Sequence, residues 1–348
     1  MCITQKTRKL FINRIQSFFM KPKVAINGFG RIGRLSLRVL LAQNKVDIVA
    51  INDLADTATL AHLLKYDSSY GLYPNVTHHG HYINVNEQSI PTYTIADPTS
   101  LPWEKLEVDI VIEATGIFLN HAGAGKHITA GAKRVIISAP AQGRDIPPVV
   151  LGVNEAILAQ QPLIISNASC TTNCLAPMAK VLDNNFGIDS GYINTIHAYT
   201  ADQRLQDAPH KDLRRARAAG VSIIPTSTGA AKAVGLVLPH LQGKLDGIAM
   251  RVPVSNGSVV DFTVKLKEQT TQQDVNKALQ KAAQNEMKGI LAYTEDPLVS
   301  VDIIGNRHSC IIDGPLTLVN GNLVKVVGWY DNEGGYANRI ADLVNKIS

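Results

Sequence analysis

The feature that most constrains the fold is a glycine-rich turn, GFGRIG at residues 28–33, which separates two different hydrophobic patterns. Residues 24–27 form a short apolar run closed by glycine, which predicts a buried strand. Residues 34–44 place leucines at helical spacing, and residues 47–52 return to a strand that is followed by Asp53. A strand, a tight turn, a helix and a second strand in this order predict part of a parallel sheet.

The glycines of this turn and the acid beyond it fit a dinucleotide site. Gly28 allows the tight turn, Gly30 lets the backbone approach a pyrophosphate, and Gly33 lets the helix pack close to the strand. The start of the helix offers unpaired N–H groups and a partial positive charge to phosphates. Asp53 lies 20 residues past Gly33, where an acid hydrogen-bonds the adenosine ribose and favours NAD over NADP. The alternative is that the glycines serve only a packing turn and Asp53 merely ends a strand.

Two strand patterns divide the chain. In the first part, short β-branched strands at residues 24–27, 47–52, 108–115 and 134–138 alternate with helical segments at 34–44 and 121–131. Strands that are buried on both faces and separated by helices predict a doubly wound, mainly parallel sheet. Beyond residue 170, longer strands are predicted at 191–199, 245–254, 258–266 and 323–330. These favour an α+β domain with a mixed or antiparallel sheet.

A chain of 348 residues is too long for one ordinary core, so we expect two domains. The first, a dinucleotide-binding domain, comprises residues 21–169 and 332–348, because the apolar helical face near the C-terminus must dock on a core. The second domain comprises residues 170–331. Residues 1–20 form a basic N-terminal extension, interpreted as non-structural; a transit-like segment is the alternative.

Composition excludes several classes of protein. Hydrophobic residues make up 45% and charged residues 18%, which excludes a disordered chain, and no apolar run reaches the ~20 residues of a membrane span. The net charge is +5, but residues 1–20 hold four basic residues and no acid, so the rest of the chain is nearly neutral. We therefore expect neither nucleic acid nor membrane as a partner. Four cysteines are too few for a disulfide framework and indicate a reducing, cytoplasmic compartment.

Cys170 lies where a predicted strand gives way to a helix, in the run SNASCTTNC at residues 166–174. Ser169 or a neighbour can cap that helix, so Cys170 occupies its first turn, where the helix dipole is expected to lower the pKa of the thiol. The alternative is an inert core cysteine. A disulfide to Cys174 is disfavoured by helical spacing, and no ligand pattern for zinc follows, so no metal is expected. Cys174 is interpreted as a packing residue.

His197 lies on a later predicted strand. A lone histidine is usually structural, but an imidazole within about 3 Å of Cys170 could take the thiol proton. Sequence alone does not establish that contact.

Several runs together resemble the phosphorylating glyceraldehyde-3-phosphate dehydrogenase family. They are INGFGRIGR, SNASCTTNC, HAYTADQRLQDAPHKDLRRARAA, IIPTSTGAAKAV, MRVPV and WYDNEGGYANRI, and the resemblance covers residues 23–348 in order. It implies NAD-dependent oxidation of glyceraldehyde 3-phosphate, with inorganic phosphate, to 1,3-bisphosphoglycerate through a hemithioacetal and a thioester on cysteine. It also implies a glycolytic or gluconeogenic enzyme, a homotetramer, and a catalytic role for the second domain.

The resemblance assigns roles to individual residues. Cys170 is the expected nucleophile and His197 the expected base. The residues expected to bind substrate phosphate are Thr200 and Arg251; those for the attacking phosphate are Ser169, Thr171, Thr228 and Gly229. Those expected along the cofactor, besides the glycines and Asp53, are Arg31, Ile32, Ser138 and Asn332, of which Asn332 would hold the nicotinamide carboxamide. Ala208 departs from the leucine of many NAD-specific members, which implies some tolerance of NADP.

Two other functions remain open at this point. Erythrose-4-phosphate dehydrogenase would share the fold and the nucleophile but depend weakly on inorganic phosphate. The retained TSTGAA run at residues 226–231 favours the phosphorylating enzyme. A non-catalytic nucleotide- or RNA-binding protein is the more distant alternative, disfavoured because nucleophile, base and arginine are all present.

Overall fold

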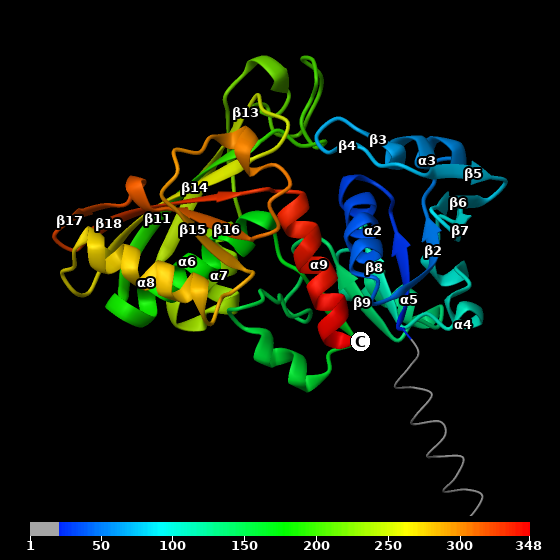
Figure 1. Ribbon diagram of the computed structural model, residues 1–348, viewed down its shortest axis with the longest axis horizontal. Coiled ribbons are helices and arrows are strands. Elements are labelled where there is room, and N and C mark those ends of the chain that lie inside the picture. The colour runs from blue at the N-terminus through cyan, green and yellow to red at the C-terminus, as the bar shows by residue number, and fades with distance from the viewer. Residues whose placement is uncertain (1–20) are drawn as a thin grey trace, which may run out of the picture.

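The computed structural model describes residues 21–348 and contains two large sheets with the C-terminal helix α9 (Gly334–Ile347) between them (Figure 1). The basic extension predicted at residues 1–20 lies outside the described residues. Within residues 21–348, no helix is both long and apolar enough to cross a membrane.

The first sheet has eight strands in the order β10-β9-β8-β1-β2-β7-β6-β5. Neighbours from β10 to β7 pair in parallel, whereas β7, β6 and β5 form an antiparallel edge. The strands are β1 (Lys23–Asn27), β2 (Asp47–Asn52), β5 (Val76–His79), β6 (Tyr82–Val85), β7 (Gln88–Tyr93), β8 (Ile110–Glu113), β9 (Arg134–Ile137) and β10 (Ile164–Ser166). The predicted mainly parallel sheet is confirmed, and the antiparallel edge is an element that the sequence pattern did not predict.

Helices cover both faces of this sheet, because alternate residues of each strand point to opposite sides. The helices are α2 (Arg31–Gln43), α3 (Thr57–Lys65), α4 (Trp103–Leu106) and α5 (His121–Thr129). In β8, Ile110 and Ile112 join a core with residues of α2, α3 and α9, whereas Val111 joins a second core with Trp103 of α4. A doubly wound architecture follows from this alternation. A short hairpin, β3 (Tyr66–Asp67) and β4 (Gly71–Leu72), follows α3.

The second sheet is mixed. Its order is β12-β13-β11-β14-β18-β16-β15, with β17 paired to β18, and only β11–β13 and β15–β16 are parallel. The strands are β11 (Ile188–Ala198), β12 (Ile224–Ser227), β13 (Leu245–Val252), β14 (Ser258–Leu266), β15 (Leu291–Thr294), β16 (Cys310–Asp313), β17 (Leu318–Asn320) and β18 (Leu323–Tyr330). The predicted α+β domain with a mixed sheet is confirmed.

Three helices pack on one face of the second sheet: α6 (Cys170–Phe186), α7 (Ala230–Val237) and α8 (Gln272–Gln284). Ile193 of β11 is buried in their core, whereas the preceding Tyr192 is exposed on the opposite face. Among the described residues, no α-helix covers the opposite face of this sheet.

The helix α9 packs on the first sheet although it directly follows β18 of the second. Its residues Ile340, Leu343 and Val344 are buried in the same core as Val24 of β1 and Leu37 of α2. The chain thus crosses between the sheets twice, once from β10 into α6 and once from β18 into α9. The residues at these two crossings form the site described next.

Candidate active site

A strained elbow between β10 and α6 places Cys170 at the first position of α6. Ala168 has a φ of 53°, in the left-handed region that costs a non-glycine residue about 1–2 kcal/mol. Its N–H donates to Ser166 Oγ at 3.0 Å, and Ser166 Oγ donates to the carbonyl of Ala139 at 2.6 Å. Such strain persists only where the surroundings enforce it, and it is common at active sites.

The elbow is also braced from within α6. Ser169 caps the helix, as predicted: its Oγ accepts the N–H of Thr172 at 3.0 Å. Asn173 Nδ2 donates to the carbonyl of Asn167 at 2.8 Å and to that of Ser169 at 3.0 Å. The main chain on both sides of Cys170 is therefore fixed by side chains.

The structure brings Cys170 and His197 together. Cys170 Sγ lies 3.4 Å from His197 Nε2, although the residues are 27 positions apart. On the other side of the ring, His197 Nδ1 lies 2.7 Å from the carbonyl oxygen of Ala198. Because a carbonyl only accepts, this hydrogen bond requires the proton to lie on Nδ1, the tautomer in which the lone pair of Nε2 faces the thiol. The geometry is that of a nucleophile beside a base.

Burial opposes the formation of either ion by itself. It raises the pKa of the Cys170 thiol, an effect that Arg251 and the N–H and hydroxyl of Thr171 counteract. Burial is the main cause that lowers the pKa of His197 to about 3, and the positive charge of Arg251 is the second cause. The expectation that the first helical turn lowers the thiol pKa is therefore wrong for the thiol alone, since desolvation outweighs the favourable contacts. Moving the proton from sulfur to Nε2 gives a thiolate beside an imidazolium. These opposite charges attract each other, so the two groups titrate together.

Register explains why Arg251 joins this pair. β11 and β13 run in parallel with His197 opposite Arg251. Arg251 Nη1 lies 2.8 Å from His197 Nδ1, 3.1 Å from the carbonyl of Ala198 and 3.3 Å from Thr200 Oγ1. Because arginine only donates, it bonds the carbonyl and the hydroxyl when Nδ1 carries a proton. Its buried Nε has no partner within residues 21–348, so an unused donor remains at the position predicted for a phosphate.

The four residues predicted for a second phosphate are found in two groups. Ser169 and Thr171 flank Cys170, and Thr228 and Gly229 directly precede α7, which packs against α6. Thr171 is buried, and its hydroxyl lies 2.9 Å from that of Tyr330. Thr228 Oγ1 accepts the N–H of Ala230 at 3.2 Å, and Gly229 is exposed. The Thr171 hydroxyl thus points to the core, whereas Gly229 presents its backbone to solvent.

The glycine turn borders a groove of about 290 Å³ at the carboxyl ends of β1 and β2. Gly28 has a φ of 90°, and a Cβ there would meet Thr115 N at 2.5 Å; a Cβ on Gly33 would meet the Gly28 carbonyl at 2.1 Å. A Cβ on Gly30 would meet nothing within 4 Å, because Gly30 faces the groove. Of the three glycines in the turn, only Gly30 leaves room for a ligand against the backbone, and this is the arrangement that a dinucleotide requires.

Asp53 lines the same groove and supports its floor. Asp53 Oδ2 accepts the N–H of Phe29 at 2.7 Å, and Oδ1 accepts that of Ala55 at 3.0 Å. The carboxylate therefore fixes the glycine turn and retains lone pairs for ribose hydroxyls. Ala208 does not line this groove and is exposed in the loop between β11 and β12.

The side chains predicted along the cofactor differ in how freely they can bind it. Arg31 forms ion pairs of 2.5 Å with Asp67 and with Glu333, so its guanidinium is already occupied. Ile32 packs against the core of the first sheet, and the Ser138 N–H donates to the carbonyl of Glu113 at 2.9 Å. Asn332 lies two residues past the end of β18 and accepts from Ser258 through Oδ1 at 2.8 Å.

Two residues of the site were not predicted. Tyr330 lies edge-on to His197, with ring centres 5.9 Å apart, and its hydroxyl contacts Thr171 and, at 2.8 Å, Thr195. Glu113 is buried beneath the groove, where its carboxylate accepts from Asn27, His127 and Thr115. The sequence signal available for Glu113 was a glutamate at the end of the apolar run of β8. No sequence pattern indicated Tyr330.

Comparison with known proteins agrees with this geometry. Residues 22–121 match the family model of the glyceraldehyde 3-phosphate dehydrogenase NAD binding domain, and residues 169–332 match that of the C-terminal domain. The chain is 58% identical over 328 residues to glyceraldehyde-3-phosphate dehydrogenase 2 of Streptomyces avermitilis, covering 93% of this chain and 98% of the relative. It is 56% identical to glyceraldehyde-3-phosphate dehydrogenase of Mycobacterium avium, covering 93% of this chain and 98% of the relative, and 55% identical to glyceraldehyde-3-phosphate dehydrogenase of Priestia megaterium, covering 94% and 99%.

Proposed function

The chain belongs to the glyceraldehyde-3-phosphate dehydrogenase family and is an NAD-dependent oxidoreductase, and we propose that it acts through a thioester on Cys170. The observation that carries this proposal is the 3.4 Å contact between Cys170 Sγ and His197 Nε2 at the elbow. A sulfur at a helix start, beside an imidazole whose other nitrogen is fixed, is suited to nucleophilic attack on an aldehyde.

In the first step, His197 Nε2 takes the thiol proton as Cys170 Sγ attacks the carbonyl carbon of glyceraldehyde 3-phosphate. A C–S bond forms, the carbonyl π pair moves to oxygen, and the imidazolium returns the proton to that oxygen, giving a hemithioacetal. His197 then removes the hydroxyl proton while hydride leaves the same carbon, and the C=O bond of a thioester forms. His197 thus moves a proton in both directions, and its fixed Nδ1–H keeps Nε2 aimed at the reacting atoms.

Bound NAD would supply the hydride acceptor. The residues that would hold it are the turn glycines with Arg31 and Ile32, Asp53 at the adenosine ribose, and Ser138 and Asn332 toward the nicotinamide. The main-chain N–H groups at the start of α2 suit the pyrophosphate, and Gly30 leaves their approach open.

Two anion sites complete the proposed reaction. Arg251 and Thr200 would bind the phosphate of the substrate, which is supported by the buried, unpartnered Nε of Arg251. Ser169, Thr228 and Gly229 would surround inorganic phosphate together with Thr171, which would contribute its main-chain N–H because its hydroxyl contacts Tyr330. Attack of a phosphate oxygen on the thioester carbon breaks the C–S bond, releases Cys170 and forms the acyl phosphate 1,3-bisphosphoglycerate.

The domain limits of the proposal follow the two crossings of the chain. Residues 21–169 with 332–348 form the NAD-binding domain, supported by the packing of α9 on the first sheet. Residues 170–331 form the catalytic domain, which begins at the nucleophile. The free thiols of Cys170, Cys174 and Cys310 support a reducing, cytoplasmic compartment.

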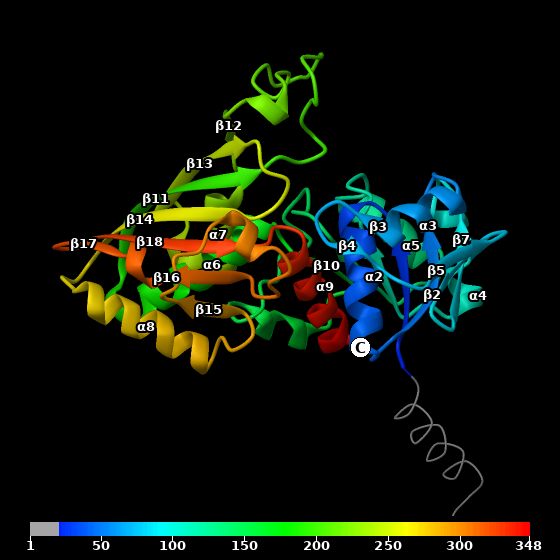
Figure 2. The ribbon, with the colours of Figure 1, turned by 45° about the horizontal axis from the view of Figure 1, so that its top comes forward.

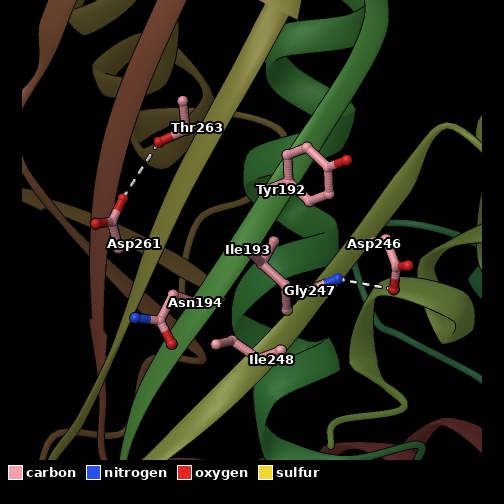
Figure 3. A pocket seen from close by; sticks show the side chains of 8 residues that line it. All are labelled: Tyr192, Ile193, Asn194, Asp246, Gly247, Ile248, Asp261 and Thr263. Carbon is pink, nitrogen blue, oxygen red and sulfur yellow. Dashed lines mark hydrogen bonds between the residues drawn. The ribbon is translucent and has the colours of Figure 1, made fainter.

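We also propose a homotetramer. The helix-free face of the second sheet carries Tyr192 and Ile248, 73% and 47% exposed, beside a shallow depression (Figure 3). The segment between β11 and β12 projects from the body of the molecule (Figure 2), and its Leu205 and Leu213 are more than 80% exposed. Apolar surface of this extent favours burial between copies of the chain. Light scattering should give four times the chain mass, and Tyr192→Asp should reduce it.

The decisive experiment is NAD-linked turnover of glyceraldehyde 3-phosphate with and without inorganic phosphate, run with NAD and NADP in parallel. We expect sustained NADH formation that requires phosphate and prefers NAD, with about one NADH per active site formed when phosphate is left out. Repeated turnover without phosphate, or faster oxidation of erythrose 4-phosphate, would contradict the proposal.

A further inference from the structure

A buried hydroxyl connects the catalytic histidine's strand to the residue that faces the nicotinamide. Ser258, the first residue of β14, is fully buried and lies opposite Tyr330 of β18. Its Oγ lies 3.1 Å from the main-chain N of Ala198, the last residue of β11, and 2.8 Å from Asn332 Oδ1. The hydroxyl therefore bridges the ends of two strands that reach the active site.

The chemistry of these partners determines where the hydroxyl proton points. A main-chain N–H only donates, so Ser258 Oγ accepts from Ala198. Its single proton then has one acceptor among the described residues, the oxygen of the Asn332 amide. With the amide reversed, two donors would face Oγ and the hydroxyl proton would be left unpaired in a fully buried position, which is unfavourable.

The orientation of the Asn332 amide follows from this. Oδ1 points inward to Ser258, and Nδ2 points away from it, with no acceptor within residues 21–348. We propose that Ser258 is a positioning residue that holds Asn332 with its NH2 group toward the cofactor, so that the site donates a hydrogen bond to the carbonyl oxygen of the nicotinamide carboxamide. This inference rests on the proposed role of Asn332.

The same bridge reaches the base. The carbonyl of Ala198 accepts from His197 Nδ1, while the N–H of Ala198 donates to Ser258. The main chain of Ala198 is thus fixed by hydrogen bonds at both its carbonyl and its N–H. Ser258 therefore connects His197, the proposed base, to Asn332, the proposed nicotinamide contact.

A cofactor analogue distinguishes the two orientations of the amide. In 3-acetylpyridine adenine dinucleotide a methyl ketone replaces the carboxamide, so this group accepts a hydrogen bond but cannot donate one. NAD can turn its own carboxamide to match either orientation of Asn332, whereas the analogue can match only an NH2 group. Dissociation constants for both cofactors, measured by calorimetry, therefore report on the amide without requiring turnover.

Ser258→Ala should raise the dissociation constant of the analogue about tenfold more than that of NAD. Ser258→Thr, which keeps the hydroxyl, should retain the wild-type ratio. Ser36→Ala is the matched control, because Ser36 is equally buried on α2 but its hydroxyl has no partner among the described residues; it should change neither constant. Equal effects of Ser258→Ala on both cofactors, or no effect, would overturn the inference.

A second variant keeps the test decisive if Ser258→Ala does not fold. Asn332→Asp offers only acceptors to the cofactor, so the analogue should lose at least about ten times more affinity than NAD. Equal loss for both cofactors contradicts the orientation. If the shifted ratios appear but the wild type does not oxidise glyceraldehyde 3-phosphate, the proposed substrate is wrong and the orientation of the amide stands.

Discussion

Replacing His197 tests how much of the reactivity of Cys170 comes from its neighbour. In the ion pair, charges 3.4 Å apart attract by about 5 kcal/mol at an effective dielectric constant of 20. That energy corresponds to about 3.6 pKa units, and solvent at the half-buried cysteine reduces it to about 2–3 units. The low pKa of His197 applies beside the neutral thiol; beside the thiolate this attraction raises it, and the imidazolium in turn stabilises the thiolate. Removing His197 must therefore raise the apparent pKa of the thiol. We therefore expect His197→Asn to shift the pH profile of thiol alkylation upward by about 2–3 units.

The assay is the rate of iodoacetamide alkylation of Cys170 against pH, with the modified residue identified by mass spectrometry. Cys174 and Cys310 are buried and should react slowly. Turnover should fall by about 10²–10⁴ in the same variant. His240→Asn removes an exposed imidazole that binds Asp183 and should alter neither measurement. An alkylation profile of His197→Asn that overlays the wild type would refute the coupling of the two groups.

Four further variants test the thiol and the groove. Cys170→Ser should reduce oxidation to roughly a thousandth or less while NAD affinity, measured by calorimetry, stays near wild type; normal turnover would exclude the thiol mechanism. Asp53→Asn should reduce kcat/KM with NAD about 10-fold to 100-fold and with NADP less; an unchanged cofactor preference would remove Asp53 from the ribose. Gly33→Ala should destabilise the protein by about 1–3 kcal/mol in denaturant unfolding, because its Cβ would lie 2.1 Å from a carbonyl oxygen. Gly30→Ala should unfold like the wild type but bind NAD more weakly, and equal stability losses for both glycine variants would contradict this division.

Short-range pattern was sufficient for most of the fold. The strand at β1 and the helix α2 follow from a β-branched run and from leucines at helical spacing, which are local properties. The edge strands β5, β6 and β7 were not predicted. In β5, Thr77, His78 and His79 are exposed and polar, so this strand lacks the hydrophobic alternation on which the prediction depends. In β6 and β7 residues do alternate, with Ile83, Val85 and Ile90 buried, but each run holds only one or two large apolar residues among polar ones.

The site was predictable where one segment determines it and less so where distant segments meet. Ser169 and Cys170 belong to one elbow, and their cap and helix position were predicted from local sequence. The 3.4 Å contact with His197 depends on how β11 packs beside α6, which spacing along the chain does not encode. Likewise, Glu333 occupies the guanidinium of Arg31 from 302 positions away.

Net pKa shifts were the least predictable property. The first-turn position of Cys170 was expected to lower the pKa of its thiol, but burial by the surrounding residues raises it. Burial is set by the whole fold, whereas the helix start is set by a few residues, so the sequence revealed the smaller of the two effects.

The proposed reaction passes through a covalent bond between Cys170 and the substrate. Mixing the enzyme with NAD and glyceraldehyde 3-phosphate without inorganic phosphate, followed by an acid quench and peptide mass spectrometry, tests this directly. We predict one 3-phosphoglyceroyl group on Cys170, which disappears when phosphate is added before the quench. NADH formation with no acyl group on Cys170, or with the group on another residue, would contradict the account.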